Sequence, residues 1–302
     1  MNKTILFRIT FLVLVLALSI LAVIPLDRAK TDRANWMADL VDGTPLNELS
    51  IPGTHDSGAL YSFADVSGKC QTLCVADQLQ IGVRFLDIRL QLVDDELRVV
   101  HSFVDQKTEL GDLLDDIAVF LRAHPTEFLL VSFKEDAAPK RSEVDFAEKL
   151  EQMLQGYGDI LSTATTLPAT VGEARGKMHV LARYADATIG LPCYDGWKDD
   201  TSFLLDNVYV QDNYSVGNAG EKFLDVSDAF VAASTREHAL VLNYTSCYLS
   251  GGFPPIYAGL PAHDLHTWME ASIPLIDGPL GILLCDFITS DMAELIIGRN
   301  FQ

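Results

Sequence analysis

The chain has 302 residues, of which 49% are hydrophobic and 21% are charged. This length accommodates one large α/β barrel or two smaller domains, and the composition excludes a disordered chain. The formal net charge of −20 argues against nucleic acid as a partner, because neutralising phosphates requires Lys and Arg. An anionic membrane surface would repel the same charge.

The N-terminal 26 residues have the pattern of an export signal. Lys3 and Arg8 precede an apolar run from Phe11 to Leu26, which is at the short end of the roughly 20 residues that a membrane-spanning helix needs. No small-x-small cleavage site follows, so both a cleaved signal peptide and an uncleaved signal anchor remain open. We expect residues 1–26 to be that signal and residues 27–302 to form one exported domain. The protein would then be secreted or held at the cell surface by its N-terminal segment.

Short apolar runs of strand length alternate with helical patterns along the rest of the chain. The predicted strands are Ile81–Leu90, Leu97–Phe103, Phe128–Lys134, Met178–Tyr184, Asn207–Asp212, Ala239–Tyr244 and Leu280–Phe287. The predicted helices are a segment from Leu110 that ends at His124-Pro125, then Ser142–Leu154, and segments near Asp225–Ser234 and Asp264–Ala271. Eight or so strands, several of them separated by helices, favour a single α/β barrel over an open sheet.

The chain has five cysteines, and export permits disulfide bonds. Because the count is odd, at least one thiol must stay unpaired or pair with another chain. Cys70 and Cys74 could form a local bridge. A zinc site at this pair is less expected, because no matching second Cys/His pair follows. Cys285 lies in an apolar run and is expected to be a buried thiol.

Polar side chains stand in, or just past, the ends of the predicted strands. These residues are His55, Asp87, Arg89, His101, Lys134, Arg183, Asp212 and Asp286. In a barrel of parallel strands the carboxyl ends converge on one mouth. So many charges at strand ends therefore predict a functional site at that mouth.

Two histidines near carboxylates, together with an arginine, are suited to displacement at phosphorus. Histidine can take and give a proton near neutral pH, and a carboxylate on the far ring nitrogen fixes its tautomer. Arginine presents donors that match phosphate oxygens. In-line transfer needs a base, an acid and positive charge on the equatorial oxygens. Taken singly, each histidine would be better explained as a core or loop residue with a satisfied hydrogen bond.

The order of several segments makes the case specific. The blocks "NWMADLVDGTPLNELSIPGTHDSGAL", "GVRFLDIRL", "RVVHSF", "FLLVSFKED", "GKMHVLARY", "VQDNYSV" and "LLCDFI" occur in this order between Asn35 and Ile288. In this order they resemble the bacterial-type phosphatidylinositol-specific phospholipases C, of the PLC-like phosphodiesterase superfamily with its X domain. "SIPGTHDSG" is the most diagnostic segment. The resemblance implies a distorted or incomplete TIM (β/α)8 barrel as the single catalytic domain.

The resemblance also implies a role for each site residue. His55 matches the general base that takes the proton of the inositol 2-hydroxyl, and Asp286 matches the carboxylate that orients it. His101 matches the general acid for the diacylglycerol leaving group, and Asp56 matches the carboxylate that supports it. Arg89 matches the arginine on the phosphate, with Asp87 on the same strand. The residues that match binding of inositol hydroxyls or stacking on the ring are Lys134, Arg183, Asp212 and Tyr214.

Arg89 also bears on metals. Calcium-dependent relatives have carboxylate ligands near this position, whereas a guanidinium cannot ligate calcium but can supply its charge. We therefore expect a metal-independent reaction without a cofactor. Trp197 leaves two interpretations open, an exposed aromatic that touches a membrane or a partly buried loop anchor.

The resemblance implies an enzyme that cleaves phosphatidylinositol to diacylglycerol and inositol 1,2-cyclic phosphate. Glycosylated phosphatidylinositol anchors are a second substrate candidate. The expected partner is a phospholipid at a membrane surface, with no nucleic acid, and the protein is expected to act as a monomer. The alternatives are a related phosphodiesterase acting on another phospholipid headgroup and a catalytically silent lipid-binding domain.

Overall fold

The computed structural model describes residues 32–62, 68–102, 104–249 and 259–302. The expected signal or anchor, residues 1–26, lies outside these ranges. Within them, no helix is both long enough and apolar enough to cross a membrane.

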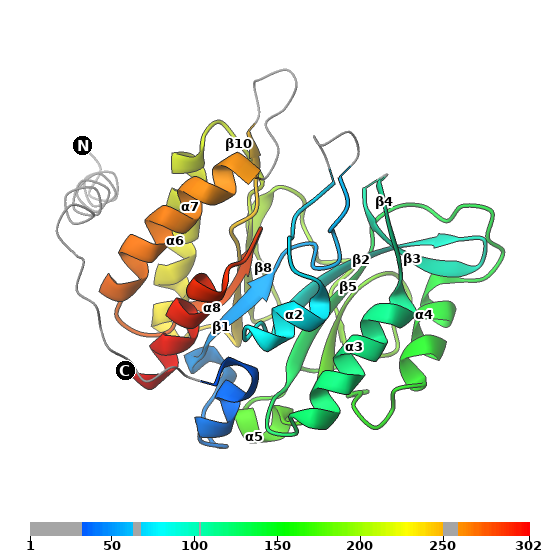
Figure 1. Ribbon diagram of the computed structural model, residues 1–302, viewed down its shortest axis with the longest axis horizontal. Coiled ribbons are helices and arrows are strands. Elements are labelled where there is room, and N and C mark those ends of the chain that lie inside the picture. The colour runs from blue at the N-terminus through cyan, green and yellow to red at the C-terminus, as the bar shows by residue number, and fades with distance from the viewer. Residues whose placement is uncertain (1–31, 63–67, 103, 250–258) are drawn as a thin grey trace.

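Eight parallel strands form a curled sheet with an opening, as predicted for an incomplete barrel (Figure 1). In chain order they are β1 (Ser50–Thr54), β2 (Phe85–Val93), β5 (Leu129–Glu135), β6 (Met178–Arg183), β7 (Leu191–Pro192), β9 (Val208–Asp212), β11 (Leu240–Tyr244) and β13 (Gly281–Cys285). Their order in space is β7-β6-β5-β2-β1-β13-β11-β9, so the first strand lies between the second and the last. An antiparallel strand, β8 (Thr201–Leu205), covers the outer edge of β9. Among the described strands β7 and β8 form the two edges, and the barrel is open between them.

Helices cover the outside of the sheet in two groups. In Figure 1, α6, α7 and α8 lie on one flank, and α2, α3 and α4 lie on the other. The helices are α2 (Val75–Gln80), α3 (Leu110–Ala123), α4 (Phe146–Gln155), α5 (Val171–Ala174), α6 (Ala219–Thr235), α7 (Gly259–Ser272) and α8 (Ser290–Ile297). Short 3-10 turns are η1 (Arg33–Asp39), η2 (Leu46–Glu48), η3 (Ile273–Leu275) and η4 (Gly298–Phe301).

Most predicted elements are present, but one predicted strand has a different place. The run Leu97–Phe103 is β3 (Glu96–His101), which pairs antiparallel with β2 and with β4 (Val104–Glu109) and lies off the ring. A second small sheet pairs β10 (Ser215–Val216) with β12 (Tyr248–Leu249). The ring is completed instead by β1 and β7, which were not recognised as strands. Each contains a proline, which lacks a backbone donor and is depleted in central strands.

Pro52 is tolerated in β1 because of where its backbone faces. Its carbonyl accepts from the Arg84 amide at 2.9 Å, on the side of β2. β2 begins only at Phe85, so a donor at position 52 would face the very start of that strand. Gly53 permits close packing at the same place, because a Cβ there would lie 3.0 Å from the Cβ of Phe85 and 3.2 Å from the Leu283 carbonyl oxygen.

Alternation along the strands separates the core into an outer and an inner part. On β2, Leu86 and Ile88 belong to the hydrophobic cluster beneath the helices, whereas Phe85 belongs to the cluster inside the barrel. Asp87 and Arg89 share the inner face with Phe85, because successive side chains of a strand point to opposite sides. The inner face therefore changes from apolar to charged toward the carboxyl end of the strand, where a barrel mouth lies.

A buried ion pair holds the opposite end of the barrel. The side chains of Arg84 and Glu127 are fully buried, and Arg84 Nη2 lies 2.7 Å from Glu127 Oε2. Glu127 Oε1 accepts a further bond from the Met37 amide at 3.0 Å. The Arg84 guanidinium also donates to the carbonyl oxygens of Arg33, Ala34, Leu79 and Val83. These bonds join η1, the end of α2 and the starts of β2 and β5.

Replacing Glu127 with glutamine would leave the Arg84 guanidinium buried without its counter-charge. We expect Glu127→Gln to lower the free energy of unfolding by about 3–5 kcal/mol, measured by urea titration. The matched control is Asp159→Asn, because Asp159 pairs with Arg122 and both side chains are 53% exposed. That variant should change stability little, since exposed ion pairs are screened by water. Equal losses in the two variants would contradict a special role for the buried pair.

Candidate active site

The segment Thr54–Gly58 turns sharply out of β1 and is fixed to β2. The Ser57 hydroxyl accepts from the Asp87 amide, and the Ser57 amide donates to the Asp87 carbonyl, both at 2.8 Å. Asp56 has φ of 46°, a left-handed conformation that non-glycine residues rarely adopt. Such strain persists only where the surroundings impose it, and it clusters at functional sites. Here the left-handed turn at Asp56 directs the side chains of His55 and Asp56 toward different partners.

His55 is held between a carboxylate and a guanidinium. Its Nδ1 lies 2.8 Å from Asp286 Oδ1, and its Nε2 lies 2.7 Å from Arg89 Nη2. Because Arg89 can only donate, Nε2 accepts and the proton of the neutral ring sits on Nδ1, where it is donated to Asp286. Burial disfavours the imidazolium, but the charge and hydrogen bond of Asp286, together with the charge of Asp56, outweigh it, so the pKa of His55 is raised from its usual value. This tautomer leaves Nε2 as the basic atom facing the cavity.

His101 faces the same space from the off-ring hairpin. β2 continues past the barrel mouth and β3 returns, with Leu90 opposite Val99 in register, so His101 ends β3 close to the mouth. Its Nε2 lies 3.5 Å from Asp56 Oδ2, and its ring centroid is 6.3 Å from that of His55. The two imidazoles thus stand apart with Asp56 between them. Burial raises the pKa of Asp56, with Arg89 and His101 opposing the rise.

Arg89 lies at the centre of a group of carboxylates. Its Nε is 3.3 Å from both Asp56 Oδ2 and Asp87 Oδ2, and its Nη1 is 3.8 Å from Asp136 Oδ1. Burial raises the pKa of Asp87, but Arg89 and Arg183 outweigh that effect, and the net shift is downward. The guanidinium therefore balances charge that would otherwise be costly in the protein interior.

Three basic residues stand in register across adjacent strands. Arg89 of β2 is opposite Lys134 of β5, and Lys134 is opposite Arg183 of β6. Lys134 Nζ lies 2.6 Å from Asp136 Oδ1, and the Arg183 guanidinium carbon lies 3.6 Å above the Trp197 ring. The row presents positive charge along one side of the barrel mouth.

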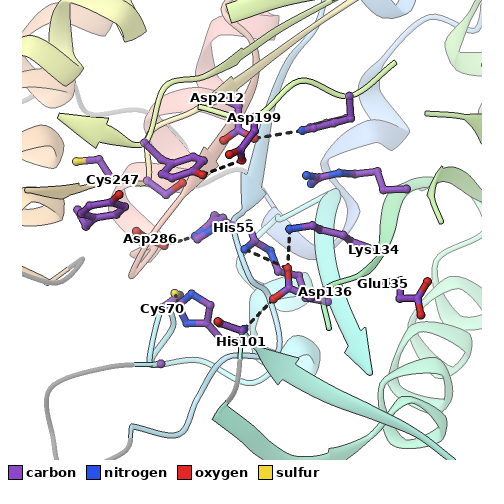
Figure 2. Close-up of a pocket in the computed structure, with 18 of the residues that line it drawn as sticks. His55, Cys70, His101, Lys134, Glu135, Asp136, Asp199, Asp212, Cys247 and Asp286 are labelled. Carbon is purple, nitrogen blue, oxygen red and sulfur yellow. Dashed lines mark hydrogen bonds and ion pairs between the residues drawn. The ribbon is translucent and has the colours of Figure 1, made fainter. Parts of the chain in front are cut away.

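These groups open into one cavity of about 570 Å³ (Figure 2). Eight of the ten predicted site residues line it, namely His55, Arg89, His101, Lys134, Arg183, Asp212, Tyr214 and Asp286. The other two, Asp56 and Asp87, are buried and contact Arg89 directly. The structure therefore brings the whole predicted set together. The separate catalytic and binding roles of these residues stay predictions.

Several residues at the site were not anticipated. Asp136 accepts from Lys134 and from the Ser102 amide, and Arg89 and Lys134 outweigh burial to lower its pKa well below the usual range. Its position two residues after Lys134, on the same face of an extended chain, was a usable signal. Tyr244, at the end of β11, had no such signal, because in the sequence it cannot be distinguished from the other apolar residues of the predicted strand Ala239–Tyr244. Its ring lies 6.1 Å from that of His55.

Trp197 is a partly buried anchor, which settles the two interpretations left open by the sequence. Its Nε1 donates to Asp212 Oδ2 at 3.3 Å, and its ring packs edge-on against Phe203 and Tyr244. The five cysteines are all free thiols, so the local bridge between Cys70 and Cys74 is absent. Cys285 is fully buried, as predicted.

Comparison with known proteins agrees with this geometry. Residues 44–177 match the family of phosphatidylinositol-specific phospholipase C, X domain. The 1-phosphatidylinositol phosphodiesterase of Listeria monocytogenes is 26% identical over 277 residues, which cover 88% of this chain and 84% of that protein. That of Staphylococcus aureus is 32% identical over 205 residues, covering 60% and 64% respectively.

The solved structures extend the likeness to nearly the whole fold. A phosphatidylinositol-specific phospholipase C from S. aureus superposes with a TM-score of 0.77 at 27% identity, covering 89% of this chain and 98% of that one. The fold and site together define a phospholipase C-type α/β-barrel enzyme. Within that class, the chain is similar to the bacterial-type phosphatidylinositol-specific phospholipases C.

The contact between His55 and Asp286 predicts a pH effect. A base works only when neutral, so kcat/KM should fall as pH drops through the pKa of His55, which lies above the usual 6.5. Asp286→Asn removes the charge that raises this pKa, so the acid limb of the profile should move to lower pH. The maximal rate should also fall by on the order of 10²-fold or more, because tautomer control is lost. An acid limb that stays in place in Asp286→Asn would assign it to another group.

Proposed function

We propose that residues 27–302 form a phosphatidylinositol diacylglycerol-lyase that yields diacylglycerol and inositol 1,2-cyclic phosphate. The observation that carries the proposal is the shared cavity. The two histidines and Arg89 line the same 570 Å³ space as the four residues matched to inositol binding, Lys134, Arg183, Asp212 and Tyr214. The names of the relatives, 1-phosphatidylinositol phosphodiesterases, support the same substrate. Glycosylated phosphatidylinositol anchors present the same headgroup linkage and are the second candidate substrate.

In the proposed reaction His55 acts as the base. Its Nε2 takes the proton of the inositol 2-hydroxyl, whose oxygen then attacks phosphorus and forms the cyclic phosphate. In the free protein, Arg89 Nη2 lies 2.7 Å from His55 Nε2 and donates a hydrogen bond to it. Substrate must therefore displace this contact, and the guanidinium turns its donors to the phosphate oxygens. Asp286 stabilises the imidazolium that forms, without itself taking the proton.

His101 acts as the acid. Protonated His101 donates to the departing diacylglycerol oxygen, and buried Asp56 lies 3.5 Å from its Nε2. The 6.3 Å between the two ring centroids leaves room for a phosphate between base and acid. Attacking and leaving oxygens then lie on opposite sides of phosphorus, as in-line displacement requires.

Arg89 supplies the positive charge at phosphorus in this scheme, so we infer a reaction that needs neither metal nor cofactor. The remaining inferences concern localisation, the place of action and the oligomeric state. The signal-like N-terminus supports an exported protein, secreted or anchored at the cell surface. The lipid substrate implies action at a membrane surface, and one chain contains the complete site, which is consistent with a monomer.

The test is phosphorus NMR of the products formed from phosphatidylinositol vesicles in the presence of EDTA. We expect inositol 1,2-cyclic phosphate to appear, and phosphatidylcholine vesicles to give no product. Cleavage of both lipids would favour the alternative of a related phosphodiesterase with another headgroup preference. Binding without cleavage would favour a catalytically silent lipid-binding domain.

The two histidines can be separated by the leaving group. His55→Ala and His101→Ala should each lower turnover of phosphatidylinositol by on the order of 10²–10⁴-fold while the fold is retained. With an inositol phosphodiester whose leaving group is a nitrophenol, which departs without protonation, His101→Ala should recover activity and His55→Ala should not. Equal recovery of both variants, or near-normal activity of either on the lipid, would contradict the assignment.

Arg89 provides a second test. Arg89→Lys keeps the charge but loses the planar fork that spans His55, Asp56 and Asp87, so kcat should be badly impaired. Arg141→Lys is the matched control, because Arg141 pairs with Asp94 in a pair about 60% exposed (61% and 59%), away from the cavity lining. That variant should retain full activity. A rate for Arg89→Lys near that of the control would show that a point charge suffices.

A further inference from the structure

Cys70 has no role in the proposed reaction, yet its thiol lies against the catalytic groups. It is 1% exposed, and its Sγ lies 3.8 Å from His101 Nδ1. Figure 2 shows the sulfur beside the His101 ring, at the edge of the cavity. The main chain of Cys70 is fixed on both sides, because its amide donates to Ala59 and its carbonyl accepts from Phe287. The position of the sulfur is therefore set by the fold.

Asp56 gives an independent sign that a ligand belongs at this place. Its side chain is 1% exposed, and neither carboxylate oxygen has a hydrogen-bond partner in the described part of the chain. Its Oδ2 has basic neighbours at looser distances, 3.3 Å to Arg89, 3.5 Å to His101 and 3.8 Å to His55. A buried carboxylate without hydrogen bonds is costly, and a bound cation would satisfy it.

Asp56, Cys70 and His101 form a ligand set for a soft divalent cation. One ligand atom from each can be chosen so that all lie within 4.8 Å of one another. Zinc binds thiolate at about 2.3 Å and imidazole or carboxylate at about 2.0–2.2 Å, so tetrahedral ligand atoms stand roughly 3.5 Å apart. The 3.5 Å between His101 Nε2 and Asp56 Oδ2 is of this size. Cys70 Sγ lies 3.8 Å from the other ring nitrogen, Nδ1, so the ring must turn for one nitrogen to share a metal ion with both partners. Thiolate favours zinc over calcium or magnesium, which prefer oxygen.

A second triplet shares the same sulfur but is less suited to a metal. His55, Cys70 and Asp286 also lie within 4.8 Å of one another. Both ring nitrogens of His55 are engaged, however, one with Asp286 at 2.8 Å and the other with Arg89 at 2.7 Å.

We propose that Asp56, Cys70 and His101 bind Zn²⁺ in the active site, and that this cation inhibits the enzyme. With three protein ligands, a tetrahedral zinc ion keeps a fourth position for water. The inhibition, but not the binding, rests on the proposed function, because the cation would occupy His101 and its supporting Asp56. Sequence patterns did not predict this site, because its three ligands come from separate segments and Cys74 is not among them.

Binding is tested first with Co²⁺ as a spectroscopic probe on the full chain after treatment with EDTA. We expect one equivalent of Co²⁺ to bind with a thiolate-to-metal charge-transfer band in the near ultraviolet, and Zn²⁺ to displace it. Cys70→Ser should abolish the band. Cys247→Ser and Cys74→Ser should keep it, because Cys247 lines the same cavity outside both triplets and Cys74 is the nearest other thiol in the chain.

Inhibition is tested on phosphatidylinositol vesicles. Zn²⁺ should inhibit the unmodified enzyme, and EDTA should restore the rate. Cys70→Ser should keep the basal rate but need at least about 10-fold more Zn²⁺ for half-inhibition, since loss of even an indirect metal contact costs that much affinity. Cys70→Ala serves as a second variant, and circular dichroism confirms the fold of each.

The outcomes separate the two proposals. A full cobalt band in Cys70→Ser, or none in the unmodified protein, would overturn the metal site whatever the activity shows. A protein that binds Co²⁺ as described but cleaves no lipid would retain the site and reject the enzymatic proposal. Equal zinc sensitivity of Cys70→Ser and Cys247→Ser would overturn the link between this site and inhibition.

Discussion

The parallel pairing of the first and last barrel strands positions His55, the proposed catalytic base. β1 and β13 are in register from Ser50 opposite Gly281 to Thr54 opposite Cys285, although more than two hundred residues separate them in the chain. The next residue on each strand is His55 and Asp286, so their 2.8 Å contact follows directly from this register. A slip of one residue would turn one of the two side chains away from the barrel interior. The strand pairing that joins β1 to β13 therefore also brings His55 and Asp286 together.

The two ends of the barrel use buried arginines in different ways. At the end of the barrel opposite the mouth, the Arg84 guanidinium pairs with one carboxylate and donates to a set of backbone carbonyl oxygens, so all of its donors are engaged. At the mouth, Arg89 stands among three carboxylates and a histidine, with contacts of 2.7–3.8 Å that a substrate anion could replace. The first arrangement stabilises the fold. The second keeps a guanidinium in place but available to a substrate.

The mouth is acidic as well as basic, and this balance shapes its chemistry. Asp56, Asp87, Asp136 and Asp286 hold the cationic side chains in fixed positions before any ligand arrives, which favours electrostatic preorganisation. Asp56, together with the Cys70 thiol and His101, forms the proposed site for a soft cation. The proposed use of Arg89 in place of a metal ion is therefore compatible with sensitivity to a metal, provided that the metal prefers sulfur and nitrogen.

The sequence by itself determined the class of fold and most of the residues that line the site. Apolar runs such as Phe128–Lys134 predicted buried strands, and charges at their ends predicted the mouth, because both patterns depend on local burial alone. Tertiary structure alone decided which charges meet. The hairpin β2–β3 carries His101 back to the mouth although β3 is not a barrel strand, and the proline-containing β1 and β7 complete the ring. Tyr244 and Cys70 joined the site without a clear motif, since distances between residues far apart in the chain depend on strand register, which local sequence patterns do not encode.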